Sequence, residues 1–301
     1  MTRFVRCAWW SGLVVLAAAW SHAETLTIAT YNLENYTVAD RMTEDGFRKN
    51  YPKPEEEKQA LRAVLIGLNA DILAVQEMGG PAYLEELRRD LKAGGLDYPQ
   101  AVLLEGPDPD RHIALLARIA PVAVRQHREI AFNYQGRQEK VKRGLLEATF
   151  RTATGDLTLF VVHLKSRFTD RADDPQSAGR RAGEATAVRD LVLQRISDPA
   201  RAQFIVLGDC NDEKRSRTVQ HLLKRGSIKL VSVLAAADSR GETWTHAYRV
   251  QDSYSRVDYV MVSARLESAV TGGVARIYDA PETRRASDHR PVVVTLQLEK
   301  R

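Results

Sequence analysis

Short polar motifs follow several apolar runs of the sequence, and their side chains are of the types that hydrolyse phosphate esters. The apolar run 203–207 (QFIVL) is followed directly by the motif 208–212 (GDCND). A carboxylate at Asp209 can take the proton of an attacking water, and the amide of Asn211 can orient that water or hold a phosphate oxygen. We therefore expect Asp209 and Asn211 to position a water molecule, although a motif of this composition can also form an ordinary Asx turn.

Five further segments place acidic, amide or imidazole groups next to an apolar run. They are residues 31–35 (YNLEN), 75–78 (VQEM), 162–166 (VHLKS), 256–260 (RVDYV) and 287–291 (SDHRP). Each is weak evidence alone, since Asn and Asp are common in turns and a glutamate at a strand end is usually a surface residue. Together with 208–212 they predict one shared site at which the strand ends meet.

The donors in these segments are mainly carboxylates and amides, with no cysteine cluster and no pair of histidines two residues apart. Hydrolysis of a phosphate ester requires a cation that neutralises charge, an activated water and donors for the developing oxyanion. Hard oxygen ligands select Mg²⁺, Mn²⁺ or Ca²⁺ over zinc. We expect Mg²⁺ or Mn²⁺ as the cofactor, and Ca²⁺ stays open.

In this order and over residues 24–298, the six segments resemble the endonuclease/exonuclease/phosphatase superfamily. Its members include deoxyribonuclease I, abasic-site endonucleases, bacterial extracellular nucleases, neutral sphingomyelinases and inositol-polyphosphate phosphatases. The resemblance implies an α/β fold, a four-layer α/β/β/α sandwich of two packed mixed β-sheets flanked by helices. It also implies a divalent-metal site at one end of that sandwich.

The resemblance assigns roles to individual residues. Glu77 and Asp288 match residues on the metal side, and Asn32 matches a residue that holds the metal or the scissile phosphate. His289 would lie against the phosphate with its ring oriented by Asp258. Whether this histidine acts as a base or as a cationic phosphate clamp stays open. Glu34 matches a position where some members carry an acid near the metal.

His163 would contact a non-bridging phosphate oxygen or protonate the leaving group. In nucleases of this superfamily a carboxylate partners that histidine, and Glu105, after the apolar run 100–104, is the best positional candidate. Basic residues that follow His163 could bind a polyanion, although a solvated loop and helix start explain them equally well. They are Lys165, Arg167 and Arg181.

Predicted strands and helices alternate along the chain and position these motifs. Apolar residues at Leu61, Val64, Leu65 and Leu68 predict a helix that begins near Pro54. No repeat and no linker divides the chain, so we expect one domain over residues 24–301. Strands are predicted at 25–30, 71–76, 157–162, 203–207, 228–234, 257–262 and 291–298, with three β-rich segments between 100 and 151. Helices are predicted from Pro54, from Pro81 to Gly94, at 177–196 and at 217–224, and a polar loop at 35–53.

The first 23 residues predict a secretory signal peptide. Arg3 and Arg6 precede an apolar stretch at 7–20, and Ser21-His22-Ala23 offers small residues for cleavage. About 14 apolar residues are short for a membrane span, although an uncleaved N-terminal anchor stays open. We expect an exported, periplasmic or secreted monomer without stable membrane insertion after cleavage.

Loss of this leader leaves Cys210 as the remaining cysteine and lowers the formal charge from +5 to +3, because two arginines leave with it. No intramolecular disulfide can then form. We read Cys210 as a small buried hydrophobe rather than a nucleophile of papain-like catalysis.

Nucleic acid is the expected substrate, because export and the HLKSR segment (163–167) resemble secreted bacterial nucleases. A formal charge of +3 is a weak electrostatic footprint for a duplex-binding protein. A sphingomyelinase-like or inositol-phosphatase-like hydrolase is the alternative, and the sequence shows no long apolar hairpin for bilayer contact. A catalytically inactive binding module is the non-enzymatic alternative, which predicts losses among residues such as Glu77 and His289 that are all present.

Overall fold

Two mixed β-sheets form the centre of the computed structural model, which describes residues 24–43, 45–169 and 171–299. The predicted leader, residues 1–23, lies outside the described residues. One sheet has the strand order β16 (Ala236–Ala237), β20 (Ala275–Ile277), β21 (Val292–Leu298), β1 (Glu24–Tyr36), β4 (Ile72–Met78), β6 (His112–Ala117) and β5 (Gln100–Leu104). The other has the order β15 (Ser232–Val233), β19 (Asp258–Val262), β12 (Gln203–Asp209), β11 (Gly155–His163), β10 (Leu145–Thr152) and β7 (Ala123–His127).

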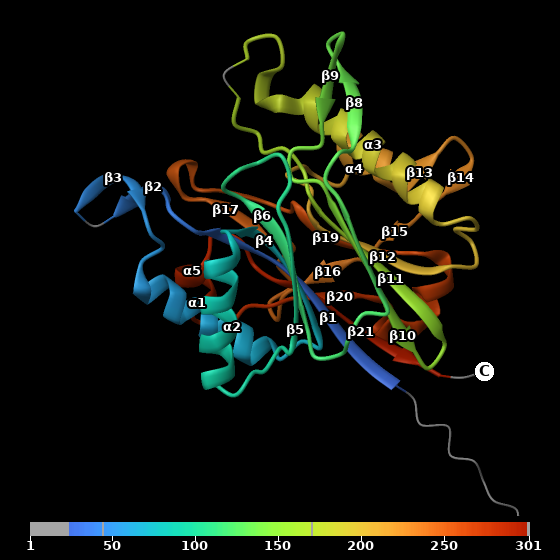
Figure 1. Ribbon diagram of the computed structural model, residues 1–301, viewed down its shortest axis with the longest axis horizontal. Coiled ribbons are helices and arrows are strands. Elements are labelled where there is room, and N and C mark those ends of the chain that lie inside the picture. The colour runs from blue at the N-terminus through green and yellow to red at the C-terminus, as the bar shows by residue number, and fades with distance from the viewer. Residues whose placement is uncertain (1–23, 44, 170, 300–301) are drawn as a thin grey trace, which may run out of the picture.

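Helices cover the outer face of each sheet, so the molecule has four layers (Figure 1). Helices α1 (Glu55–Leu68) and α2 (Pro81–Ala93) pack against the β1–β4 sheet. On the far side, α3 (Ala178–Arg195) and α4 (Arg217–Leu223) pack against the β11–β12 sheet. The predicted four-layer α/β/β/α sandwich is confirmed.

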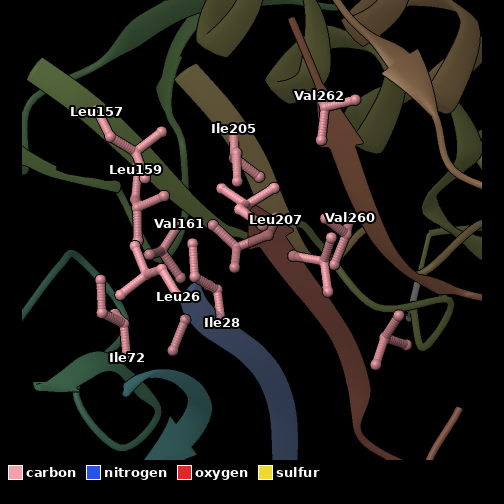
Figure 2. Close-up of a cluster of buried hydrophobic side chains, with 14 of the residues drawn as sticks. Leu26, Ile28, Ile72, Leu157, Leu159, Val161, Ile205, Leu207, Val260 and Val262 are labelled. Carbon is pink, nitrogen blue, oxygen red and sulfur yellow. The ribbon is translucent and has the colours of Figure 1, made fainter. Parts of the chain in front are cut away.

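The layer between the sheets is built by alternate residues of each strand. Leu26 and Ile28 of β1 face inward, whereas Ala29 and Tyr31 face the helices, as the two-residue period of a strand requires. Figure 2 shows these inward side chains gathered with those from β11, β12 and β19. Burial of one such Val, Leu or Ile side chain stabilises the fold by about 1.5–3 kcal/mol. This alternation is also what made the long strands predictable.

Short hairpins were not predicted. The expected loop at 35–53 contains the hairpin β2 (Ala39–Thr43) and β3 (Gly46–Tyr51), and the 100–151 region holds six strands rather than three. Two of those six, β8 (Ala131–Tyr134) and β9 (Arg137–Lys140), form a separate two-stranded sheet, as do β17 (His246–Tyr248) and β18 (Ser253–Ser255). The expected strand 228–234 is broken into β14 (Ile228–Lys229) and β15, and β14 pairs with β13 (Lys224–Arg225). These strands mostly lie exposed, so no apolar alternation marks them in the sequence.

Short helical turns complete the chain. The helix α5 (Thr283–Ala286) immediately precedes Ser287. Short 3₁₀-helices lie at Pro175–Ser177, Arg249–Gln251, Ala264–Ala269 and Thr271–Gly273. Within the described part of the chain, no helix has the length and apolar character needed to cross a membrane.

Candidate active site

The site is the polar end of the layer between the two sheets. His163 continues the inward face of β11 after Leu159 and Val161, and Asp209 continues that of β12 after Leu207. Backbone pairing places His163 opposite Asp209, and Asp209 opposite Asp258 of β19. The same alternation of side chains along each strand therefore places apolar residues in the core and then polar residues at the strand end.

Asp209 is buried and held by two amide side chains. The Asn32 Nδ2 donates to Asp209 Oδ2 over 3.0 Å, and the Asn211 Nδ2 donates to the same oxygen over 3.0 Å. The Asn211 backbone N–H donates to Asp209 Oδ1 over 2.7 Å. Burial, followed by the charge of Asp258, raises the pKa of Asp209 to about 7. A carboxylate in this state can exchange a proton near neutral pH.

Gly208 allows β12 to reach this position. A Cβ at Gly208 would lie 2.0 Å from the carbonyl oxygen of Val162, and its φ of +137° lies in the region that favours glycine. Glycine therefore lets the two strands approach each other directly before Asp209. Cys210, the next residue but one, is fully buried, and burial raises the pKa of its thiol, so its predicted role as a buried hydrophobe is confirmed.

Asp258 and His289 form a buried pair, as the predicted dyad requires. The His289 Nδ1 donates to Asp258 Oδ2 over 2.8 Å. Burial alone lowers the pKa of His289, but the Asp258 carboxylate outweighs it and holds that pKa well above its usual value. Thr245 Oγ1 accepts from the backbone N–H of Asp258, which fixes the acid. Ser287 Oγ accepts from the His289 N–H and donates to the Asn32 carbonyl, which fixes the histidine.

His163 lies completely buried between two carboxylates. Its Nε2 is 3.6 Å from Asp209 Oδ2 and 3.8 Å from Glu77 Oε1. Neither ring nitrogen has a hydrogen-bond partner among residues 24–43, 45–169 and 171–299. Burial and then the nearby charge of Arg143 hold the pKa of His163 well below its usual value, so the ring is neutral.

The predicted pairing of His163 with Glu105 is wrong. Glu105 lies exposed after β5, which is an edge strand of one sheet, whereas His163 ends β11 inside the other sheet. The Glu105 charge acts instead on His112, whose pKa burial lowers and Glu105 partly restores. Position after an apolar strand was a correct criterion for the other motifs but did not distinguish an edge strand from a central one.

Two further carboxylates, Glu34 and Asp288, form a carboxylate cluster near Asn32, whereas Glu77 at the end of β4 lies beside His163. Glu34 Oε2 accepts from the Asp288 backbone N–H, and Glu77 Oε2 accepts from the Asn35 backbone N–H, each over 2.9 Å. Burial, followed by the charge of Asp288, raises the pKa of Glu34 to about 7. Burial also raises the pKa of Asp288, but contact with His246 and then the charge of His289 outweigh it and hold this pKa at about 2.

The backbone at these positions is strained. Glu34, Asn35, Glu77 and Asn211 have φ values between +50° and +60°, a region that costs a side-chain-bearing residue about 1–2 kcal/mol. Left-handed residues of this kind collect at functional sites, where surrounding structure holds them. Here they turn the strand ends so that several acidic side chains meet.

The chain belongs by sequence and structure to a known group of enzymes. A family model described as "Endonuclease/Exonuclease/phosphatase family" matches residues 29–289. The chain is a member of this family. Its members hydrolyse phosphate ester bonds. A search of curated protein sequences finds no match.

Solved structures of this family share the fold at low sequence identity. Sphingomyelinase C from Streptomyces griseocarneus matches with a TM-score of 0.62 at 13% identity, covering 91% of this chain and 100% of that chain. A doubly substituted Staphylococcus aureus beta toxin with bound magnesium ions matches at 0.62 and 14%, covering 91% and 100%. The human Nocturnin catalytic domain with bound sulfate matches at 0.61 and 17%, covering 92% and 98%.

The carboxylate cluster fits a hard divalent cation. Glu34 and Asp288 bring like charges together in a buried place, an arrangement that a cation between them relieves. Oxygen donors of carboxylates are the ligands that Mg²⁺ prefers. The Asn32 Oδ1 accepts from the Glu34 backbone N–H over 3.0 Å, so this amide joins the carboxylate cluster to Asp209.

Of the predicted substrate-binding residues, Arg181 is structural. It is 2% exposed, its Nε pairs with Asp212 Oδ2 at 3.2 Å, and its Nη1 donates to the carbonyls of Lys165 and Gln176. The predicted substrate role of Arg181 is wrong, because its guanidinium is used to join α3 to the loop after His163. Helical spacing and local charge do not reveal this inward orientation.

Lys165 and Arg167, in the loop that follows His163, differ in exposure. The Lys165 ammonium donates to the carbonyls of Ser166 and Phe168, and burial lowers its pKa to about 8. Arg167 is exposed, with its Nη2 3.7 Å from Glu213 Oε1. Of the three predicted basic residues, Arg167 is therefore the most exposed to solvent.

His246 is a site residue that the sequence did not reveal. Its ring lies against that of His289, with centroids 4.6 Å apart, and its Nε2 is 3.6 Å from Asp288 Oδ2. It belongs to the unpredicted strand β17, where no apolar run points to it. Thr245, next to it, holds Asp258 but carries no motif either.

Proposed function

We propose that this protein is an exported, metal-dependent phosphodiesterase that cleaves nucleic acids with an activated water. The observation that carries this proposal is the placement of His289 between two buried acids. Ligand atoms of Asp209, Asp258 and His289 all lie within 4.8 Å of one another at the end of the core. Burial strengthens the interaction between such charges, and clusters of this kind gather at functional sites because burying charge is costly.

The side chains divide the work of hydrolysis between them. Asp209, held by Asn32 and Asn211, takes the proton of the attacking water. His289, kept cationic by Asp258, donates from Nε2 to a phosphate oxygen as negative charge develops there. His163, neutral and buried, supplies an N–H to a second oxygen or to the leaving group. A divalent cation held by Glu34, Glu77 and Asp288 would neutralise charge on the phosphate.

Local positive charge supports a polyanionic substrate despite the small net charge. After burial, the charges of Arg143, Arg111 and Lys142 are among the causes that lower the pKa of His163. These residues contribute positive charge near His163, although Arg143 and Lys142 also pair with Asp108. Positive groups near a site attract anionic substrates and raise their association rate.

A substrate panel tests the proposal. The purified protein is incubated with single-stranded DNA, duplex DNA, RNA, sphingomyelin vesicles, an inositol polyphosphate and a phosphomonoester, with and without EDTA. We expect cleavage of a nucleic acid that EDTA abolishes, and no cleavage by Asp209→Asn. Turnover of only a lipid or a monoester would reject the nuclease assignment and leave the phosphoesterase site intact.

A membrane phospholipid is the second candidate substrate, and the β2–β3 hairpin favours it. This hairpin projects from the body of the molecule (Figure 1). Met42 and Phe47 are opposite each other across it and are 77% and 57% exposed. The sequence analysis found no long apolar hairpin, and this short hairpin exposes two apolar side chains among polar ones. Met42→Ser with Phe47→Ser should lower sphingomyelin turnover in vesicles if lipid is the substrate, and leave DNA cleavage unchanged.

Export and a monomeric state are further parts of the proposal. The motifs of residues 1–23 support export to the periplasm or the medium. The mature protein from its host should begin at Glu24, and mass spectrometry of the secreted fraction checks this. Intact Met1 in a cytoplasmic fraction would contradict export. Light scattering on a sizing column should give the mass of one chain.

A further inference from the structure

A cavity of about 260 Å³ opens directly beside Asp288 and His289. It lies between the β17–β18 hairpin and α5, and the proposed hydrolysis makes no use of it. Pockets for drug-sized ligands are about 300–1,000 Å³, so this one suits a single planar group. Its distinctive lining is aromatic and basic: Trp244, Tyr248, Tyr254, Arg249 and Arg284.

The hairpin that forms this cavity is tied to the catalytic residues. His246 and His289 form a β-bridge, and the Ala247 N–H donates to the Asp288 carbonyl over 2.9 Å. The Arg249 Nη2 donates to the Arg284 carbonyl over 2.7 Å, which joins the hairpin to α5. A group in the cavity is therefore a direct neighbour of a phosphate held at His289.

The aromatic wall offers two half-exposed rings, Tyr248 and Tyr254, and Tyr254 is the one that packs on another ring. Trp244 has the Arg290 guanidinium 3.4 Å from its ring centroid, and Tyr254 packs against it at 4.8 Å with a 53° interplanar angle. Tyr254 itself is 49% exposed. Such a fixed and exposed ring is what base-stacking sites of single-stranded nucleic acids provide.

The charged residues of the cavity wall distinguish between two kinds of ligand that aromatic pockets bind. An aromatic cage can hold a quaternary ammonium group, but the Arg249 and Arg284 guanidinium groups in this wall oppose a cation. Of the acids in the wall, Asp252 accepts from the Tyr254 hydroxyl and Asp288 lies against His246. An anionic group next to a planar ring, as in a nucleotide, matches this lining better.

We propose that the cavity binds the nucleotide unit next to the scissile phosphate, with its base on Tyr254 and its outer phosphate on Arg249 and Arg284. This inference rests on the proposed nuclease function and names the subsite that selects nucleotides.

Chromogenic esters with one leaving group test the stacking. The p-nitrophenyl esters of thymidine 5′-phosphate and thymidine 3′-phosphate are compared with methyl p-nitrophenyl phosphate at saturating Mg²⁺. For Tyr254→Ala, the ratio of kcat/KM for one of the nucleotide esters to that for the methyl ester should fall about 5- to 150-fold, the range of one base–aromatic stack. The change should lie in KM, and Tyr254→Phe should retain the ratio because it keeps the ring.

A single-stranded oligonucleotide tests the phosphate contact. Arg284→Gln should weaken its binding and reduce the slope of log affinity against log salt by about 0.7, the value for one contact. Arg201→Ala is the matched control, since Arg201 lies exposed beyond α3 and pairs with Asp198. Its kinetics and salt slope should equal those of the wild type, and thermal unfolding checks that each variant is folded.

Three results would overturn the inference. Equal losses on the nucleotide and methyl esters would make Tyr254 merely structural. If a folded Tyr254→Ala protein keeps the wild-type ratio for both nucleotide esters, no nucleobase stacks on Tyr254 in the cavity. A selective loss on p-nitrophenyl phosphorylcholine would identify a cation cage instead. Failure of the nuclease function looks different, because the wild type itself would then cleave no nucleotide ester or nucleic acid.

Discussion

Replacement of Asp258 by asparagine removes one negative charge beside His289 and keeps the shape of the side chain. The bond from His289 Nδ1 is 2.8 Å long and both groups are buried, so solvent does not replace the lost charge. A hydrogen bond to a charged group contributes about 1.5–3 kcal/mol, and a neutral one about 0.5–1.5 kcal/mol. The difference of about 1–2 kcal/mol predicts a fall in kcat of about 5- to 30-fold for Asp258→Asn.

Removal of the imidazole itself should cost more. His289→Ala deletes the donor to the phosphate, and such groups contribute about 10²- to 10⁴-fold. Both variants are assayed for kcat and KM on a chromogenic phosphodiester at saturating Mg²⁺, and their folding is checked by thermal unfolding. Asp198→Asn, an exposed acid that pairs with Arg201, serves as the control. Wild-type kcat in Asp258→Asn would refute the view that this acid maintains the charge on His289.

Three further outcomes are expected. EDTA should abolish phosphodiester cleavage and lower the unfolding midpoint, and Mg²⁺ or Mn²⁺ should restore both better than Zn²⁺, because a cation relieves the repulsion in the carboxylate cluster. Burial raises the pKa of Glu147, but hydrogen bonds from His127 and Arg195 lower it to about 2. Glu147→Gln should therefore lower the unfolding free energy at pH 7, and this loss should disappear as pH falls from about 4 to 2, measured by urea denaturation. Gly208→Ala should lower both kcat and the thermal midpoint, because its Cβ meets the Val162 carbonyl.

The long elements could be predicted because each has a buried face. Strands β1, β4, β11, β12, β19 and β21 and helices α1 to α4 all appear near their expected positions. Apolar residues with a period of two or about 3.6 mark them. The hairpins β2–β3 and β17–β18 bury little, so no apolar period marks them, and in β8–β9 the alternation is confined to Phe132 and Tyr134 of a four-residue strand. These hairpins form because neighbouring strands pair through their backbones, and amino-acid composition does not indicate such pairing.

The positions of the candidate site residues could be predicted for a related reason. Asp209, His163 and Asp258 continue the inward period of strands whose apolar residues are evident in the sequence. Glu105 and Arg181 failed because the prediction used their position along the chain without their place in the sheets. Glu105 follows an edge strand, and Arg181 turns inward to Asp212.

Substrate choice lies in the parts that the sequence predicts least. The polar ends of the core strands need the same geometry to hydrolyse any phosphate ester. They therefore do not select the organic groups that are attached to the phosphate. The β17–β18 hairpin is tied to this geometry through His246 and Ala247, yet its outer residues are exposed. Changes there alter the wall of the cavity at low cost in stability, since little apolar surface is buried. A change of substrate should therefore need substitutions in the β17–β18 hairpin and α5, which line the cavity, while the Asp258–His289 pair stays as it is.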